Sequence, residues 1–250
     1  MQGELFCFED EKYKPQKRYN KKSKTYEEFI EKFKPKHKKT TDDCYTPPDV
    51  YEVIKDFAVE QWQKEQKEEP FLMRPFYPGG DYENECYPKN AFIVDNPPFS
   101  IFARILDFYL ERNIRFFLFF DCRTLFSPLR KNRRLSFVIS DTRIYYENGA
   151  CVNTAFVTNI FNPCRLILSY NLKREIAACE SQPEIKKKIK RAYRPLDFYS
   201  PLDFGVLVNN FELEKEFIIE GAEFNPKPYS KQIKVENDEL RKMAGKLWGK

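Results

Sequence analysis

A buried strand, a proline-rich turn, a helix and a second buried strand follow one another within residues 91–120. Residues 91–94 are all apolar, apolar residues recur at helical spacing over 101–109, and residues 114–120 are apolar except for Arg115. Apolar runs without polar alternation are typical of strands covered on both faces of a parallel sheet. A strand, a crossover helix and a parallel strand form a βαβ unit, so the sequence predicts an α/β fold.

Further elements are predicted on both sides of this unit. A short helix is expected at 25–33, a longer one from Val50 to Trp62, and a strand at 71–76. Ser100 is expected to cap the helix that follows the turn. The second half carries more antiparallel patterns than the first. Its predicted elements are strands at 136–140, 144–146, 151–159 and 165–169, hairpins around 147–149 and within 204–217 around Asn209-Asn210, and helices at 183–193 and 237–248.

Composition excludes several classes of protein. The seven cysteines are odd in number, scattered and without a CxxC pair, which argues against a disulfide framework or a zinc site. The one histidine, His37, lies in a lysine-rich segment, which leaves little for Ser-His-Asp or His-metal chemistry. The N-terminus lacks a signal-peptide pattern, and no stretch approaches the ~18 apolar residues of a membrane span. We therefore expect a soluble cytoplasmic protein with no metal and no membrane partner.

Charge divides the chain unevenly. Residues 11–40 hold twelve Lys and Arg and four Glu, are interrupted by prolines and contain few aliphatic residues. We predict a basic, weakly ordered arm at 1–41 and a folded domain at 42–250. Within that domain the core is expected at 43–160 and a C-terminal accessory region at 161–250.

The turn Asn96-Pro97-Pro98-Phe99 is the main candidate site, because ligands of open α/β sheets bind outside the carboxyl ends of the strands. Two prolines restrict the backbone, so the Asn96 side-chain oxygen and a nearby carbonyl can accept from one amino group. Acceptors aligned in advance favour attack of that amine on a methyl group. Phe99 offers a face for a base rotated out of a duplex. The alternative is an ordinary strand-to-helix turn, in which Asn and Pro are common.

These residues resemble the amino-group DNA methyltransferases, especially the adenine-N6 enzymes of phages and restriction systems, whose signature is D/N/S-P-P-Y/F/W. Residues 44–50, Cys-Tyr-Thr-Pro-Pro-Asp-Val, resemble the family's Tyr-Thr-Pro element before the cofactor strand. Residues 74–80, Arg-Pro-Phe-Tyr-Pro-Gly-Gly, resemble its Asp-Pro-Phe-x-Gly-x-Gly cofactor loop. The similarity spans roughly residues 43–120.

The chain departs from the family pattern in its cofactor half. Arg74 stands where the family usually has an acidic residue, and Pro78 replaces the first glycine of the loop. The interval from Gly80 to Asn96 is too short for the helix, second strand and ribose-binding carboxylate that members normally place there. A reduced sheet is therefore implied. The acidic residues that could replace the ribose-binding carboxylate are Asp81, Glu83 and Glu85.

The resemblance implies a reduced, Rossmann-like class I methyltransferase sheet with added antiparallel strands and helices. It implies direct methyl transfer from S-adenosyl-L-methionine to the N6 amino group of adenine in DNA, without a covalent intermediate. The implied catalytic residues are Asn96, Pro97, Pro98 and Phe99. The implied cofactor-binding residues are Tyr45, Thr46, Pro47, Phe76, Tyr77, Gly79, Gly80, Asp81 and Asp95. DNA-reading elements are expected within 122–200, and the residues expected to contact DNA phosphates are Lys186, Lys187, Lys188, Lys190 and Arg191.

Two alternatives stay open. The shortened cofactor region is also compatible with an inactive methyltransferase-like module that binds nucleic acid or blocks a host defence. Related tetrads occur in enzymes that methylate RNA bases or a protein glutamine, so the substrate class is a separate question. Asp121 and Arg123 follow the second buried strand and are placed to reach the same pocket. The small size suits a phage or mobile element, hence a bacterial or phage-infected cell.

Overall fold

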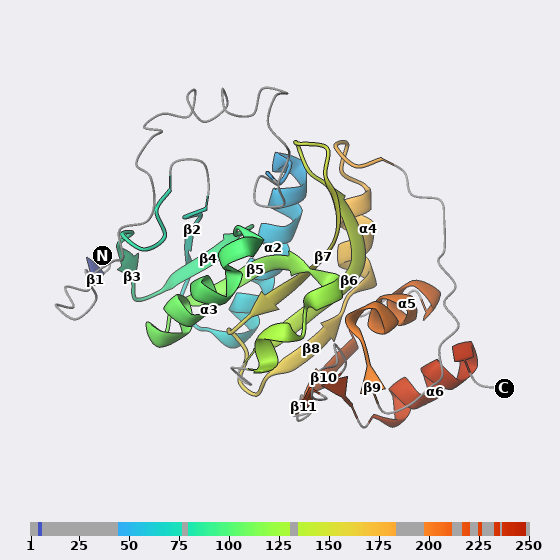
Figure 1. Cartoon of the computed structure of the whole chain (residues 1–250). Helices are drawn as coiled ribbons and strands as arrows, with labels where there is room; N and C mark the ends of the chain where they lie inside the picture. The colour runs from blue at the N-terminus through green and yellow to red at the C-terminus, as the bar shows by residue number, and fades with distance from the viewer. Residues whose placement is uncertain are drawn as a thin grey trace.

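The computed structural model describes residues 5–6, 45–76, 80–130, 135–183, 198–211, 217–220, 225–226, 233–235 and 237–248. They form a mixed α/β protein in which helices cover both faces of a seven-stranded sheet, an arrangement compatible with a Rossmann-like fold (Figure 1). Most of the predicted basic arm, the predicted helix at 25–33 and the lysine-rich run from Lys186 to Arg191 lie outside the described residues.

The order of strands in the main sheet is β10-β8-β6-β7-β5-β4-β2. Strands β2, β4, β5, β6 and β8 point the same way, whereas β7 and β10 run against them. The sheet is therefore mixed, and its reversed strands lie in the second half of the chain, where antiparallel strands were predicted. The bounds are β2 Phe71–Met73, β4 Ala91–Asp95, β5 Arg115–Asp121, β6 Ser136–Tyr145, β7 Cys151–Thr158, β8 Arg165–Leu168 and β10 Phe217–Glu220.

Two smaller sheets flank the main one. The first pairs β1 (Leu5–Phe6) with β3 (Tyr87–Pro88), and the second joins β9 (Phe198–Tyr199), β12 (Ile233–Lys234) and β11 (Asn225–Pro226). Between β2 and β4 the described residues contain β3 and turns but no helix. The sheet accordingly ends at β2, as expected from the short interval between Gly80 and Asn96.

The predicted βαβ unit is confirmed. Strand β4 leads through a 3-10 turn, η2 (Phe99–Ile101), into helix α3 (Phe102–Glu111), and β5 returns parallel to β4. Register pairs Asp95 with Leu118, so β5 extends three residues further along the shared edge, to Asp121. The prediction for Ser100 was wrong: Ser100 lies within the 3-10 turn, and the N-cap of α3 is Ile101, without a side-chain cap.

Strand β5 separates two apolar cores. Phe116, Leu118 and Phe120 face the core that includes α3, whereas Phe117 and Phe119 face the core that includes helix α2 (Pro48–Glu65). The alternation follows from the pleat of a strand, in which successive side chains point to opposite faces. In Figure 1, α3 and α5 lie in front of the sheet and α2 and α4 behind it. Burial on both sides explains the apolar run seen in the sequence.

Helix α2 covers the first half of the sheet. Its predicted apolar face is confirmed, with Val50, Ile54 and Ala58 buried against the strands. Pro48 occupies the first turn, where its missing N–H costs no helical hydrogen bond. At the other end Gln66 is extended, and the Trp62 indole N–H donates to the Glu68 carbonyl at 2.7 Å.

The second half differs from the sequence prediction at β6, at residues 170–177 and at residues 201–211. The strands predicted at 136–140 and 144–146 form one strand, β6, because a bulge between Val138 and Thr142 lets pairing with β7 resume. Helix α4 (Tyr170–Ala177) was not predicted, although the Ser169 hydroxyl caps it by accepting from the Leu172 N–H at 3.2 Å. The remaining predicted strands and the helix α6 (Asp238–Trp248) are confirmed.

The predicted hairpin within 204–217 was wrong. Residues Pro201–Phe211 form helix α5, and Asn209-Asn210 lies in its last turn rather than at a hairpin tip. The Ser200 N–H donates to the Asp203 carboxylate at 2.7 Å, and the Asp203 N–H donates to the Ser200 hydroxyl at 3.3 Å. This reciprocal capping box starts a helix whose apolar residues pack on β6.

Strands β8 and β10 continue the same sheet beyond residue 160, the boundary expected for the accessory region. Among the described residues, no helix combines the length and the apolar character that crossing a membrane requires.

Candidate functional site

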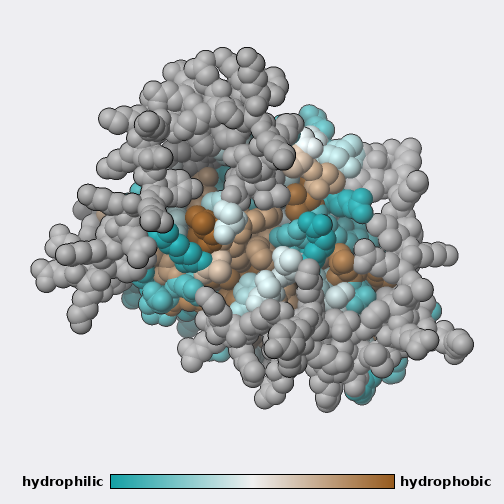
Figure 2. Space-filling view, in the orientation of Figure 1, coloured by the Kyte–Doolittle hydropathy of each residue, from teal (hydrophilic) through white to brown (hydrophobic). Residues whose placement is uncertain are grey.

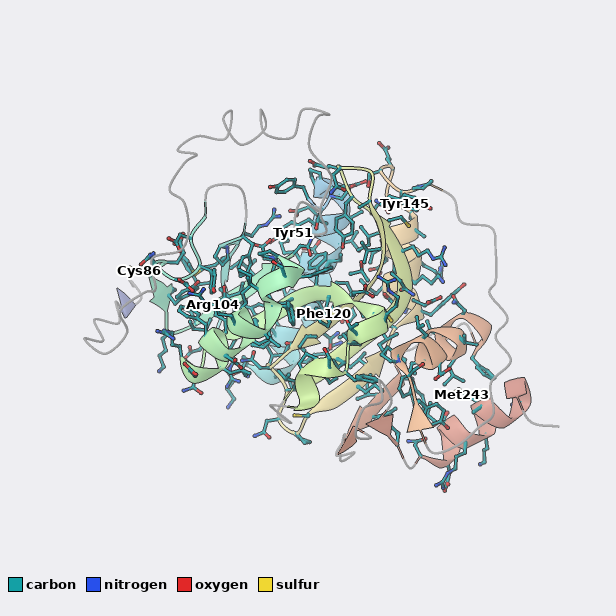
Figure 3. The ribbon with its side chains drawn as sticks, in the orientation of Figure 1. Tyr51, Cys86, Arg104, Phe120, Tyr145 and Met243 are labelled. Atoms are coloured by element: carbon teal, nitrogen blue, oxygen red, sulfur yellow. The ribbon has the colours of Figure 1, made fainter. Side chains whose placement is uncertain are left out.

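The carboxyl ends of β2, β4 and β5 meet at one edge of the sheet because the three strands are parallel. This edge brings together Arg74, the tetrad that begins at Asn96, and Asp121. Helix α2 reaches the same edge with its first turn, where the Tyr51 hydroxyl donates to the Val94 carbonyl at 3.1 Å. Figure 3 shows Tyr51 on α2 and Phe120 on β5 in the central part of the molecule.

Asp95 is the buried anchor of the edge, with only 2% of its surface exposed. One carboxylate oxygen accepts from the Phe76 N–H at 2.8 Å, and the other accepts from the Asn96 N–H at 2.9 Å. The Arg74 Nε lies 3.6 Å from the second oxygen. Burial raises the pKa of Asp95, while Arg74 and the two amides oppose that rise. Asp95 therefore ties the segment after β2 to the end of β4 from beneath the site.

The tetrad follows Asp95 directly. Pro97 is buried, and Asn96, Pro98 and Phe99 are partly buried. The Phe99 ring meets Phe120 edge-on, with ring centroids 5.8 Å apart, and Phe120 in turn stacks on Phe102 at 4.0 Å. These contacts hold Phe99 at the rim of the apolar core, with part of its surface open to a ligand.

The Tyr-Thr-Pro element forms the entry to α2. The Pro47 carbonyl accepts from the Tyr51 N–H at 2.9 Å, and the Tyr45 carbonyl accepts from the Glu147 N–H at 3.0 Å. Thr46 is 7% exposed, and its buried hydroxyl has no hydrogen-bond partner among the described residues. An unsatisfied buried hydroxyl costs about 1–3 kcal/mol, so a polar ligand group at this position would stabilise the protein.

The segment after β2 is built on aromatic contacts. Phe76 is partly buried, with its ring centroid 5.3 Å from that of Tyr82 and 6.4 Å from that of Tyr109 on α3. Gly80 is exposed, whereas the predicted cofactor residues Tyr77 and Gly79 lie outside the described residues. The ring contacts hold the Phe76 side chain against Tyr82 and against Tyr109 of α3.

The three acidic residues considered for the ribose have different surroundings. Asp81 is exposed and holds a turn, accepting from the Glu83 N–H at 3.2 Å and from the Asn84 side chain at 2.7 Å. Glu83 pairs with Arg104 of α3 at 2.5 Å and accepts from the Tyr82 hydroxyl. Glu85 is exposed. Asp81 and Glu85 are thus the more accessible carboxylates.

Asp121 and Arg123 lie at the end of β5, as predicted for the shared edge. The Arg123 guanidinium pairs with the Asp121 carboxylate at 2.5 Å, and the Arg123 N–H donates to the same side chain at 2.8 Å. The Arg123 side chain is 68% exposed. An exposed cation therefore follows the carboxyl end of β5, paired with Asp121.

The surface over this edge combines apolar and polar groups. Figure 2 shows apolar surface at the centre of the face, over β4, β5 and α3, bordered by hydrophilic residues. An apolar surface with a few polar groups around it suits a planar organic ligand better than a free ion. Among the described residues, no group of three or more His, Cys, Asp or Glu side chains could hold a metal ion.

A second polar cluster was missed by sequence reasoning. Asp141, in the bulge of β6, has a left-handed backbone with φ of 50°. Its carboxylate accepts from the Asn209 side chain of α5 and lies 3.6 Å from the Lys173 ammonium of α4. A Cβ at Gly205 would come within 2.7 Å of the carboxylate, so glycine makes room for it. Nothing local in the sequence marks this cluster, which holds both helices to the sheet.

Comparisons with known proteins gave no match to any family model, curated protein or solved structure. The class of protein is therefore defined by its fold and by the residues at the carboxyl ends of β2, β4 and β5. It is a mixed α/β protein whose sheet is compatible with a Rossmann-like fold, with a strand-end site that combines an amide, an aromatic ring and a buried carboxylate.

Proposed function

We propose that the protein transfers a methyl group from S-adenosyl-L-methionine to the N6 amino group of adenine in DNA. The observation that carries this proposal is the position of the tetrad. Asn96 begins it at the carboxyl end of β4, and Phe99 lies partly exposed at the rim of the core. The first turn of α2 and the segment after β2 flank it.

The strand order supports a ligand at this point. A Rossmann sheet of order 3-2-1-4-5-6 binds its ligand where the order reverses, beside strands 1 and 4. A sheet that ends in β2, with β4 and β5 next to it, corresponds to the 1-4-5 part of that order. The carboxyl ends of β2 and β4 are the position at which the resemblance expects the cofactor.

The residues present fit the proposed cofactor. Bound S-adenosyl-L-methionine would supply a methyl group on a positively charged sulfur. The buried Thr46 hydroxyl offers a hydrogen bond to a polar ligand. Phe76, on the segment after β2, is a partly buried aromatic residue. Gly80 is exposed, so its backbone is accessible to a ligand.

The tetrad would act on the target base. The Asn96 side-chain oxygen and a neighbouring carbonyl accept from the adenine amino group and so orient it for attack on the methyl. The hydrogen bond from the Asn96 N–H to Asp95 fixes the backbone that carries this amide. Phe99, held edge-on against Phe120, provides a stacking face for a base rotated out of the duplex.

The direct test is transfer of labelled methyl from S-adenosyl-L-methionine to unmethylated DNA. We expect label in adenine, reduced about 100-fold or more by Asn96→Ala, because one aligned group of this kind contributes about that factor. Asn171→Ala is the matched control, since Asn171 is exposed on α4, on the opposite face of the sheet from α3. Incorporation that is unchanged in Asn96→Ala would overturn the assigned role.

One observation favours the non-catalytic alternative. Arg74 occupies the position where the resembled family usually has an acidic residue, and it contacts Asp95. Heat-stability measurements with S-adenosyl-L-methionine separate the two functions, because a ligand that binds the native state raises its stability. Absence of both a stability gain and methyl transfer would identify an inactive module. Competition between DNA, RNA and protein substrates then identifies the substrate class of an active one.

A further inference from the structure

Arg74 stands at this edge where the resembled family usually has an acidic residue, and its contacts fix the position of its side chain. It follows β2 directly and carries its guanidinium over the ring of Tyr51, 3.6 Å from the ring centroid. Its Nε faces the buried Asp95 carboxylate at 3.6 Å. The side chain nevertheless remains 31% exposed. A cation is thus fixed at the strand edge, with part of its side chain exposed.

Two contacts orient this guanidinium before any ligand arrives. Tyr51 is itself fixed, because its hydroxyl donates to the Val94 carbonyl and its ring is buried in the core beneath α2. Asp95 is fixed by two backbone N–H groups, so its carboxylate cannot turn away from Arg74. An arginine held in this way loses little conformational entropy when it binds a further group.

The charged groups at this edge determine which ligand groups can bind there. Asp95 is fully buried and accepts from two amides, so it attracts a cation but cannot itself reach a ligand in solvent. The charged residue that is partly exposed beside β2 is therefore Arg74. Guanidinium groups recognise carboxylates through paired, charge-assisted hydrogen bonds.

We infer that Arg74 binds the carboxylate at the amino-acid end of an adenosyl amino-acid ligand and makes that end a determinant of affinity. This inference rests on the proposed function and names the part of the cofactor that the chain holds with its own arginine. The nucleoside end would be held elsewhere, by Phe76 and the backbone of Gly80.

The test compares two ligands that share the nucleoside but differ in the amino-acid end. S-adenosyl-L-homocysteine carries the carboxylate, and 5′-methylthioadenosine lacks the whole amino-acid end. Calorimetric titration of the full chain gives Kd for each, with Arg74→Gln and Arg74→Lys as variants. Arg104→Gln is the matched control, because Arg104 is an exposed arginine of α3 that pairs with Glu83.

We expect Arg74→Gln to weaken S-adenosyl-L-homocysteine about 10- to 100-fold, the factor typical for a hydrogen-bonded charge, and to leave 5′-methylthioadenosine within about twofold. Arg74→Lys should recover part of the loss, since it restores the charge but not the paired geometry. Unchanged binding of 5′-methylthioadenosine also shows that the variant is folded.

Other results overturn the inference in distinguishable ways. Equal weakening of both ligands would make Arg74 a structural residue that holds the edge together. Unchanged binding of both would remove it from the site, and weaker binding of a DNA duplex alone would assign it to phosphate contact. If the natural protein binds neither ligand, the proposed function fails together with the inference.

Discussion

The two halves of the sheet differ in the direction of their strands and in what their polar side chains contact. The parallel half consists of β2, β4 and β5 with α2 and α3, and it carries the candidate site. The mixed half consists of β7, β6, β8 and β10 with α4 and α5, and two of its strands run backwards. The parallel half exposes a partly buried tetrad and a fixed arginine at its edge. The mixed half satisfies its polar cluster internally, through Asp141.

This difference separates the part of the molecule that carries the candidate site from the part whose polar cluster holds helices to the sheet. In the parallel half Arg74, Asn96 and Phe99 are partly exposed near the strand ends, so ligands can reach them. In the mixed half Asp141 contacts α4 and α5, so its charge holds helices to the sheet. Substitutions in the two halves should therefore affect different measurements, and the comparison can be tested at the seam between the halves and within each one.

The largest expected effect lies at the seam. Phe156 of β7 is fully buried and stacks on Phe117 of β5, with ring centroids 5.0 Å apart. We expect Phe156→Ala to lower the free energy of unfolding by about 3–5 kcal/mol, because it leaves a cavity between the halves. Denaturant unfolding measures it. Phe71→Ala is the control, since Phe71 is 53% exposed at the β2 edge and should change stability little. Two separate unfolding transitions in Phe156→Ala would show that the halves fold independently.

A smaller effect is expected within the mixed half. Gly205→Ala places a Cβ 2.7 Å from the Asp141 carboxylate and should cost about 1–3 kcal/mol, because the cluster has to move apart. Gly245→Ala in α6 meets nothing within 4 Å and should instead stabilise that helix by about 0.5–1 kcal/mol. Thermal unfolding of both variants gives the sign. Equal effects of the two substitutions would contradict the assigned role of Asp141.

The smallest expected effect comes from comparing a serine that caps a helix with a serine that does not. Ser169→Ala removes the hydroxyl that caps α4 in the mixed half and should cost about 1 kcal/mol. Ser100→Ala, in the parallel half, removes a hydroxyl that does not cap α3 and should change the free energy of unfolding by less than about 0.5 kcal/mol. Denaturant titration resolves this difference. A loss from Ser100→Ala as large as that from Ser169→Ala would restore the original prediction for that serine.

The candidate site was predictable in part. Asn96 and Phe99 could be placed at a strand end, because an apolar run followed by a proline turn is a local pattern. The contact of Arg74 with Tyr51 and Asp95 could not be foreseen, since it joins three segments that are distant in the sequence. The sequence showed that Arg74 departs from the family pattern, but gave no indication of what the side chain touches.

The sequence by itself determined the elements of the parallel half. Helical spacing in α2 and the apolar runs 91–94 in β4 and 116–120 in β5 are local signals, and burial on both faces makes them strong. Tertiary structure alone decided the direction of β7, the bulge that joins both parts of β6, and the packing of α5 on that strand. Strand direction and register depend on which partner strands and helices bury an apolar face, and that is a property of the assembled core rather than of any short segment.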